Sequence, residues 1–302
     1  MKKRILVSGL LNIETTVAVK GFPINYFPID YPFFGVNSNV SGVGCNIAKA
    51  LTALGDDVGL VSFLGNDDES VRVISDLEKH GIRTDMISRT LKNTPASAVL
   101  FDPDGRRQVY CDLKDIQDQS ISPDDLPESV MKTDISVLCN INFNRELIRA
   151  AKKNGVVTAT DVHVLSDIND EYNRDFMENA DILFMSDERL PCPPEEFIRR
   201  ISERFGKRII VIGMGAKGAV LFDSAKDSTV TVPAYAPAKI VNTVGAGDAL
   251  FSSFIHFYIK GLTAQEALER AVIFAGIKIG FNGAAIGFSD EKTIERIYNN
   301  QK

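Results

Sequence analysis

The stretch NTVGAGDALF, residues 242–251, places a carboxylate where an apolar helix is expected to begin. Three small residues, Gly245, Ala246 and Gly247, precede Asp248, and the residues that follow are mostly large and apolar. Small side chains leave backbone N–H groups uncovered, and a helix dipole adds positive potential at its first turn. The pattern therefore predicts a binding site for an anion such as phosphate, with Asp248 held ionised beside it.

A carboxylate beside a bound phosphate is electrostatically unfavourable unless it has a task. Asp248 could accept the proton of a hydroxyl group that attacks the phosphorus atom. The alternative is an ordinary acidic residue at a helix start, which is common, whereas G-A-G-D before a buried helix is less common. We therefore take Asp248 as a candidate catalytic base, with Gly245, Ala246 and Gly247 as the residues that hold the phosphate charge.

Two further glycine-rich stretches could bring backbone close to a ligand. In SGVGCNIAKALTALG, Gly42 and Gly44 precede a predicted helix, and Asn46 offers both a donor and an acceptor to a polar ligand. The alternative is a simple turn from a loop into a helix.

GMGAKG, residues 213–218, fits the G-x-G-x-x-G pattern of dinucleotide-binding folds. That reading requires a helix next, but the strand-like run AVLFD follows, which argues against a dehydrogenase. Its glycines, Gly213, Gly215 and Gly218, instead predict a tight turn between two strands.

The elements that must position these residues alternate between short apolar runs and amphipathic stretches. Strands are predicted at RILVSGL, DVGLVSFLG, DISVLCN, VVTATDV, DILFMS and RIIVIG. Helices are predicted between them, at CNIAKALTALG, ESVRVISDLEKHG, NRELIRAAKKNG and PEEFIRRISERFG, and several end on glycine. Alternation of this kind predicts an α/β fold with a mainly parallel sheet. After residue 245 the chain is expected to be helical, with a capping box at Thr263 and Glu266.

Two segments lack the crossover helices of this pattern, at about residues 12–40 and 92–116. The second has two strand-like runs around the turn Asp102–Gly105, which is typical of a β-hairpin. We expect both segments to form a small separate sheet that acts as a lid on a single domain spanning residues 1–302.

Composition limits the partners of the chain. Its formal net charge is -6, which argues against nucleic acid as a ligand. No run of about 18 uncharged apolar residues is present, so no membrane span is predicted. The four cysteines, Cys45, Cys111, Cys139 and Cys192, lie far apart in the sequence, which favours a reducing cytosol over a disulfide framework or a zinc site.

Three motifs, in this order, resemble those of the PfkB (ribokinase-like) family of sugar and nucleoside kinases. NTVGAGDA resembles the family's DTxGAGD, SGVGCNIAKALTALG resembles its glycine-rich turn and helix, and GLLNIETTV resembles its opening G-x-x-N-x-D. The likeness covers essentially the whole chain.

The resemblance implies a three-layer α/β/α core with a small β-sheet lid. It implies transfer of the γ-phosphoryl group of ATP, with Mg²⁺, to a hydroxyl group, usually a primary one, with Asp248 as the base. Sugar-binding positions implied by the motifs are Asn12, Glu14, Gly42, Val43, Gly44 and Asn46. Positions implied for ATP are Ser186, Gly213, Gly215, Gly218 and Asn282, and a metal role is implied for Glu188.

Several residues depart from the family pattern. Glu14 stands for Asp, and Val43 replaces a Lys of ribokinases proper, which removes one sugar contact. Asn242 replaces the Asp that opens the second motif, which puts the monovalent-cation site of some members in question. Glu188 is shifted by one position from the Glu that helps to organise Mg²⁺.

The acceptor substrate stays open between a small sugar and a nucleoside such as pseudouridine, because the aromatic stretch NYFPIDYPFF could form a wall for a base. A non-catalytic sugar or nucleotide sensor is a further alternative, which the intact G-A-G-D argues against. The same aromatic stretch is too apolar to stay exposed, and several family members dimerise through their lids, so a homodimer through the lid is expected.

Overall fold

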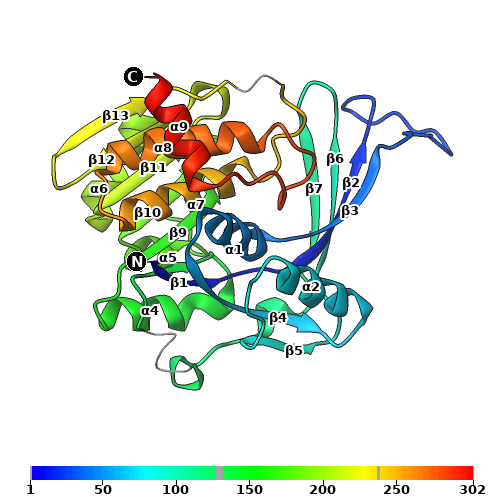
Figure 1. The fold of residues 1–302 in the computed structure, drawn as a ribbon, viewed down its shortest axis with the longest axis horizontal. Helices are drawn as coiled ribbons and strands as arrows, with labels where there is room; N and C mark the ends of the chain where they lie inside the picture. Colours follow the sequence, from blue (N-terminus) through cyan, green and yellow to red (C-terminus); the bar gives the residue numbers. More distant parts are fainter. Residues whose placement is uncertain (1, 127–131, 237–238, 302) are drawn as a thin grey trace.

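The computed structural model describes residues 2–126, 132–236 and 239–301. Within these residues the chain forms a large sheet and a smaller one (Figure 1). The large sheet has nine strands in the order β13-β12-β11-β10-β9-β8-β1-β4-β5. These strands are β1 (Arg4–Ser8), β4 (Asp57–Gly65), β5 (Ile87–Leu91), β8 (Ile135–Leu138), β9 (Thr158–Val164), β10 (Ile182–Ser186), β11 (Ile209–Gly213), β12 (Ala219–Asp223) and β13 (Ser228–Val232).

Most of the large sheet is parallel, as the alternating pattern predicted. β1 pairs in parallel with β4 and β8, and the parallel pairing continues through β9, β10 and β11. At one edge, β12 pairs antiparallel with β11, and β13 with β12. The strand after GMGAKG is therefore present as expected, and it forms part of this edge.

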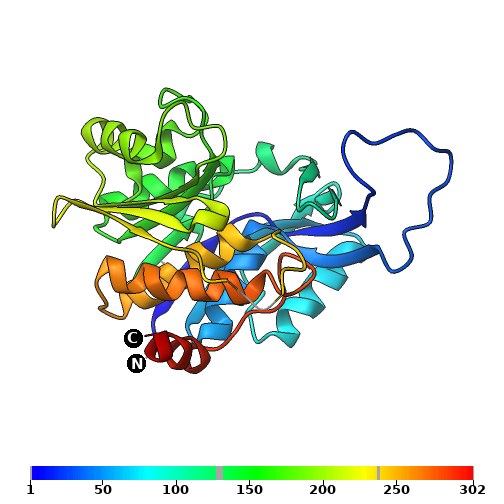
Figure 2. The ribbon, with the colours of Figure 1, turned by 90° about the horizontal axis from the view of Figure 1, so that it is seen from above.

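Helices cover both faces of the large sheet, which gives three layers (Figure 2). The three central residues of β1 are apolar because Ile5 and Val7 join the core on one face, and Leu6 joins the core on the other. The first face carries α1 (Val43–Leu54), α2 (Asp68–Lys79), α7 (Ala246–Ile259), α8 (Ala264–Lys278) and α9 (Glu291–Gln301). The second carries α4 (Arg145–Lys153), α5 (Arg174–Asn179) and α6 (Pro194–Phe205). The predicted α/β class and layer arrangement are confirmed.

The end of the chain is helical, as predicted from residue 245 onward. α8 begins with the expected capping box, in which Thr263 and Glu266 each bind the backbone N–H of the other. In the part of the chain that the structure describes, none of the helices combines the length and the apolar character needed to cross a membrane.

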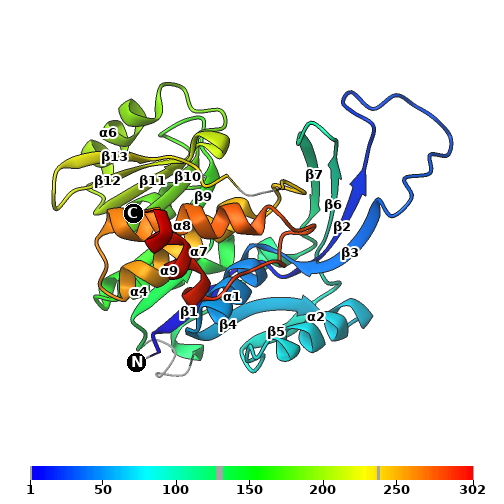
Figure 3. The same ribbon diagram turned by 45° about the horizontal axis from the view of Figure 1, so that its top comes forward.

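The smaller sheet projects from one end of the core (Figure 3). Its strand order is β3-β2-β6-β7, and the strands are β2 (Asn12–Ala18), β3 (Val36–Ser41), β6 (Ala96–Phe101) and β7 (Arg107–Asp112). The hairpin between β6 and β7 is the predicted one, and its turn is closed by the N–H of Gly105, which donates to the carbonyl of Asp102 at 3.0 Å. The two segments without crossover helices therefore supply the small sheet.

A long loop, residues 19–35, joins β2 to β3 and extends beyond the small sheet (Figure 3). Large apolar side chains on this loop face solvent, and Tyr26 and Phe33 are 91% and 85% exposed. The exposed set is Ile24, Tyr26, Phe27, Ile29, Tyr31, Phe33 and Phe34; we call it the aromatic loop surface.

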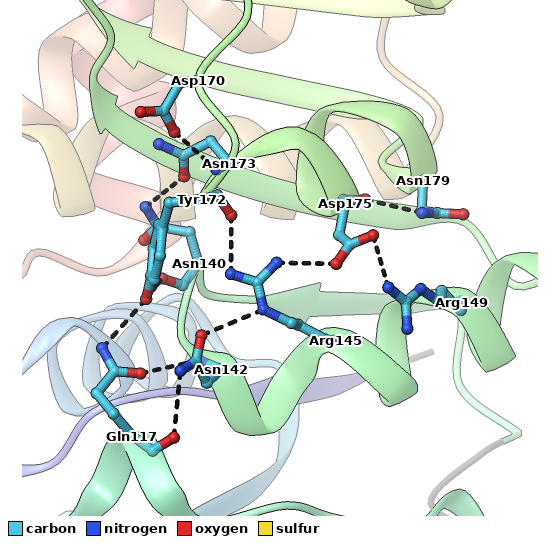
Figure 4. Close-up of polar contacts among 10 residues, drawn as sticks. All are labelled: Gln117, Asn140, Asn142, Arg145, Arg149, Asp170, Tyr172, Asn173, Asp175 and Asn179. Carbon is cyan, nitrogen blue, oxygen red and sulfur yellow. Dashed lines mark hydrogen bonds and ion pairs between the residues drawn. The ribbon is translucent and has the colours of Figure 1, made fainter.

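A polar cluster fixes the segment that leads from the small sheet back to the core (Figure 4). Gln117 belongs to the short 3₁₀ helix η1 (Ile116–Asp118) of this segment, and it accepts the N–H of Asn142 at 3.2 Å. The Oδ1 atom of Asn142 accepts from Nε of Arg145 at 3.1 Å, and Arg145 also reaches Asp175 at 2.8 Å. These contacts tie η1 to the starts of α4 and α5, so the base of the small sheet is anchored to the core.

Candidate active site

Asp248 lies where parallel strands of the large sheet end. The first turn of α7 carries it, and α7 packs against α1 and β9. In open α/β sheets, ligand sites form outside the carboxyl ends of the strands. The structure therefore places the predicted base at the carboxyl ends of the strands, where a ligand site is expected.

The loop before α7 presents free backbone N–H groups, with one change from the predicted set. Gly245 is the N-cap of α7 and has φ 77°, in the left-handed region. The N–H of Ala246 is used within the loop, because it donates to the carbonyl of Thr243 at 3.2 Å. Within residues 244–248, which the structure describes, the N–H groups without an acceptor are those of Gly245, Gly247 and Asp248.

The two glycines of this loop serve different purposes. A side chain at Gly245 would collide with Ala284, because the ideal Cβ position lies 2.7 Å from the carbonyl oxygen of Ala284. A Cβ atom at Gly247 would meet no other atom within 4 Å. Gly245 is therefore required by the fold, whereas Gly247 keeps open the space through which an anion can approach the free N–H groups.

A series of polar contacts links Asp248 to the small sheet. Nδ2 of Asn46, in α1, donates to Oδ2 of Asp248 at 2.6 Å. Oγ of Ser41, at the end of β3, lies 3.3 Å from Oδ1 of Asn46 and 3.3 Å from Oε2 of Glu14. The candidate base and the candidate sugar-binding carboxylate thus belong to one network.

Two acceptors in this region have no hydrogen-bond partner. Glu14 and Asn12, both on β2, are 7% and 3% exposed, and neither Oε1 of Glu14 nor Oδ1 of Asn12 is paired in the described part of the chain. Nδ2 of Asn12 is held by Oγ of Ser97 at 3.0 Å. A buried unpaired polar group costs about 1–3 kcal/mol, so a ligand with hydroxyl groups would relieve both residues.

Burial raises the pKa of the carboxyl groups of Asp248 and Glu14 above their ordinary values. At Asp248 this effect outweighs the charge of His163 and the hydrogen bond from Asn46, which lower the pKa. At Glu14 burial raises the pKa, hydrogen bonds from Ser41 and from the backbone of Ala284 lower it, and Asp248 adds to the rise. The position of Asp248 in the first turn of α7 was expected to favour its ionised form, and burial acts in the opposite direction on its pKa. A base whose pKa moves toward neutrality is better suited to proton transfer.

Two residues of β9 that were not predicted act on Asp248. Asp161 lies opposite Phe184 of β10, and the register shifts before Val164, which lies opposite Ser186, so His163 lies within a bulge that begins after Asp161. His163 has φ 59°, and its N–H donates to Oδ1 of Asp161 at 2.8 Å. A bulge changes the direction of side chains. The signal in the sequence was an Asp and a His at the end of the predicted strand, in VVTATDVHV, residues 156–164.

The glycines at the start of α1 are packed against the chain itself. Gly42 has φ 103°, and a Cβ there would lie 2.4 Å from the carbonyl oxygen of Leu10. A Cβ on Gly44 would lie 2.7 Å from the backbone of Gly9. Val43 between them packs partly buried against the core. The close approach predicted for a ligand is therefore occupied by the loop between β1 and β2, and these residues position their neighbours.

Residues predicted for ATP lie at the ends of β10 and β11. Ser186 ends β10, and its hydroxyl accepts the N–H of Glu188 at 3.1 Å. The side chain of Glu188 is exposed. Gly213 ends β11, and Gly215 begins the 3₁₀ helix η4 (Gly215–Lys217) with φ 54°. These residues lie at the carboxyl ends of the strands, on the same side of the sheet as Asp248.

The two other predicted ATP positions have partners inside the fold. Gly218 has φ 97°, and a Cβ there would lie 2.0 Å from the carbonyl oxygen of Val232, so the turn into β12 requires glycine. Oδ1 of Asn282 accepts from Nδ2 of Asn242 at 3.1 Å. Asn282 is thus tied to the beginning of the loop that precedes α7.

Two cations that were not predicted approach the same loop. Lys278, the last residue of α8, is 0% exposed, and its Nζ donates to the carbonyl of Val244. Nη1 of Arg107, on β7, donates to Oγ1 of Thr243 at 3.3 Å. Lys278 is the one charged residue in the apolar run FAGIKIG, so the sequence could have indicated it as a candidate site residue. Arg107 could not be identified in this way, because its position depends on how the small sheet meets the core.

A cavity of about 560 Å³ lies beside α8. Tyr235 and Ala236, after β13, form one wall, and Val272 and Ile273 of α8 form the other. Its apolar wall could accept a flat ring. No group of three His, Cys, Asp or Glu side chains that could hold a metal ion occurs within residues 2–126, 132–236 and 239–301.

Comparison with known proteins agrees with this geometry. A sequence profile of the pfkB family carbohydrate kinases matches residues 2–291. The chain is 25% identical over 288 residues to an ATP-dependent ribose-1-phosphate kinase of Halopiger xanaduensis, covering 93% of each chain. It is 26% identical over 291 residues to a deoxyribokinase of Salmonella typhi, covering 92% of this chain and 93% of the relative.

A solved structure shows the same fold. The ribokinase of Arabidopsis thaliana, in complex with ribose and ATP, superposes with a TM-score of 0.80 at 20% identity, covering 99% of each chain. The nine-stranded sheet, its two helical layers and the smaller sheet therefore form a ribokinase-like fold.

Proposed function

Because this chain belongs to the pfkB family of carbohydrate kinases, we propose that it transfers the γ-phosphoryl group of ATP to a primary hydroxyl group of a small sugar. The observation that carries the proposal is the network between Glu14 and Asp248. Unpaired acceptors for hydroxyl groups lie at one end of it, and free N–H groups beside a carboxylate lie at the other.

In the proposed reaction, each residue has a separate task. Sugar hydroxyl groups donate to Oε1 of Glu14 and Oδ1 of Asn12, which orients the sugar with its reacting hydroxyl near Asp248. Asp248 accepts the proton of that hydroxyl as its oxygen bonds to the γ-phosphorus, while the bond from this phosphorus to the bridging oxygen of ADP breaks. The N–H groups of Gly245 and Gly247 stabilise the charge on the transferred group.

The nucleotide is proposed to lie along the ends of β10 and β11. Ser186, Gly213 and Gly215 border its phosphates, and the cavity beside α8 accepts the adenine ring. Mg²⁺ is bound in such sites by substrate phosphates and one or two carboxylates, which suits a chain with isolated acidic residues such as Glu188. The metal ion would neutralise phosphate charge when bound.

The proposed substrate is of pentose size. The relatives are named for ribose-1-phosphate and for a deoxyribo-sugar, and two unpaired acceptors suit a compact molecule with several hydroxyl groups. A nucleoside is the second candidate. The aromatic loop surface favours it, because exposed rings could stack on a base.

The same surface supports a proposed homodimer through the small sheet.

We place the enzyme in the reducing cytosol, because ATP is its donor and its four cysteines are free.

The test is release of ADP with a panel of pentoses, deoxyribose, ribose-1-phosphate, hexoses, 2-keto sugars and nucleosides that includes pseudouridine. Asp248→Asn should lower kcat on the best substrate by roughly 10²–10⁴-fold, because a positioned base is lost. The Kd for ATP should change less than about threefold, because the amide keeps the size of the carboxylate.

Asp68→Asn is the matched control, since Asp68 is also an acidic residue in the first turn of a helix, α2, but faces solvent. It should leave kcat unchanged. A wild type that consumes no ATP with any of these compounds would refute the proposed function, and an Asp248→Asn variant that retains most of kcat would remove Asp248 from the mechanism.

A further inference from the structure

Lys278 is a charged residue in an unusual place. Its side chain is fully buried at the end of α8, and its only hydrogen bond within the described residues is the one from Nζ to the carbonyl of Val244. No carboxylate of the described chain forms an ion pair with it. Burying an ammonium group without a close counter-ion costs folding free energy. Its presence at this position therefore indicates that the charge has a function.

The bond to Val244 places this charge directly behind the anion-binding loop. Val244 precedes Gly245, the N-cap of α7, and the unpaired N–H groups of Gly245 and Gly247 follow. The N–H of Val244 is held as well, because it donates to Oδ1 of Asn242 at 2.7 Å. Both polar atoms of the Val244 backbone are thus fixed, and with them the direction in which the following N–H groups point.

The groups that act electrostatically on Lys278 come from three elements. Asp248 on α7 and Glu14 on β2 raise its pKa, and Arg107 on β7 lowers it. Burial has the largest effect and brings the pKa of Lys278 down to about 8, so the side chain is still largely protonated near neutral pH. Two carboxylates therefore act electrostatically on this ammonium group, which lies behind the loop where the phosphoryl group would bind.

We infer that Lys278 is a built-in monovalent cation, which holds the anion-binding loop in shape and offsets the negative charge of phosphoryl transfer. This inference rests on the proposed kinase function. A cation bound by a backbone carbonyl behind a phosphate site is what a free potassium or ammonium ion would otherwise provide. The residue at the start of the loop is the neutral Asn242, whose side chain is occupied by Asn282 and Val244. The enzyme should therefore work without added monovalent cation.

The experiment compares Lys278→Met, which keeps length and removes the charge, with Lys278→Ala, which also leaves space. Activity on the best sugar is measured in tetramethylammonium buffer, and potassium, ammonium or methylammonium chloride is then added at constant ionic strength. The wild type should change less than twofold on addition of any of these ions. Lys278→Met should lose kcat by roughly 10²-fold, the size typical of lost electrostatic stabilisation. Lys278→Ala should lose a similar factor and regain at least about a tenth of wild-type kcat with potassium, ammonium or methylammonium, because a small cation can enter the space vacated by the side chain.

Lys207 offers a matched control. It is also buried, its Nζ donates to the carbonyls of Glu178 and Ala180 at 2.9 and 2.7 Å, and burial lowers its pKa to about 8. It lies before β11, at the opposite end of the strands from Asp248. Lys207→Met should lower the melting temperature and leave kcat per folded molecule unchanged.

Three outcomes would overturn the inference while leaving the kinase function intact. They are a wild type that requires potassium, a Lys278→Met variant within threefold of wild-type kcat, and a folded Lys278→Ala variant that no small cation restores. If both variants fail to fold, the cation dependence of the wild type still decides, since a marked requirement contradicts a built-in cation. A wild type without activity on any acceptor would instead refute the proposed function.

Discussion

At the scale of single residues, Glu14 differs most clearly from the family pattern. Its carboxylate is one methylene group longer than that of an Asp, and Oε2 reaches the hydroxyl of Ser41 while Oε1 remains unpaired. The hydroxyl group of Ser41 therefore helps to hold the longer carboxylate in place.

Glu14→Gln should raise KM for the sugar by roughly 10–100-fold, since hydrogen bonds to charged groups contribute about 1.5–3 kcal/mol each. KM for ATP should change less than about twofold, because Glu14 lies on the small sheet, whereas Ser186 and Gly213 lie at the ends of strands of the large sheet. Separate titration of both substrates measures this.

Glu69→Gln, an exposed residue of α2, is the control for loss of one negative charge. Equal changes in both KM values, or none, would place Glu14 outside the sugar site.

The polar residues of the site could be predicted from sequence only where a motif carried them. Asp248, Asn46 and Glu14 stand in motifs, and the structure joins all three in one network. Lys278 could have been suspected from its isolation in an apolar helix. His163 could not, because its direction depends on a bulge that no local pattern indicates.

At the scale of elements, the start of α7 shows what a sequence motif determines and what it leaves open. G-A-G-D predicted the helix start, and Gly245 is indeed the N-cap. Which N–H groups remain free depends on the left-handed turn at Gly245, which lets the N–H of Ala246 bond back to Thr243. The N–H groups without an acceptor therefore include that of Asp248 and not that of Ala246.

The large sheet was predictable for a physical reason. Strands buried on both faces are mostly apolar, as in β8, where all four residues are buried and Ser136 is the one polar side chain. β5 was not predicted, because it is an edge strand in which three of five residues are exposed, which leaves no apolar pattern to detect.

Gly247→Ala and Gly247→Val test the open space in front of α7. A Cβ atom at this position would meet no other atom within 4 Å, and the backbone is not left-handed, so both variants should fold with a melting temperature close to that of the wild type. Both should still obstruct the approach of phosphate, and Val should lower kcat by roughly 10²-fold, comparable to the loss of one stabilising N–H group.

Gly245→Ala is the contrasting variant. It would strain a left-handed residue and collide with Ala284, so it should lower the melting temperature. If Gly247→Val keeps wild-type kcat, the space in front of Gly247 is not the path of the phosphoryl group.

At the scale of the whole molecule, the aromatic loop surface contrasts with the rest of the fold. The core encloses its apolar side chains on both faces of the large sheet, whereas the loop of residues 19–35 exposes seven large ones together. Val109 and Tyr110 of β7 are also exposed, on the same small sheet. A surface of this kind on a folded protein marks a binding interface.

Replacing Phe33 and Phe34 together by Ser tests whether a second copy of the chain covers this surface. The wild type should be a dimer by light scattering at micromolar concentration, because a two-fold axis would bury the same apolar loop of both subunits at once. The double variant should shift toward monomer, and its KM for the acceptor should rise, because β2 carries both this loop and the acceptors Asn12 and Glu14.

Val71→Ser with Val164→Ser is the control pair, since both valines are exposed apolar residues outside the small sheet; this variant should stay dimeric. A wild type that is monomeric at micromolar concentration would contradict the dimer. The aromatic loop surface would then need another occupant, and stacking on the base of a nucleoside would become the better explanation, because a bare sugar has no flat ring to cover these side chains.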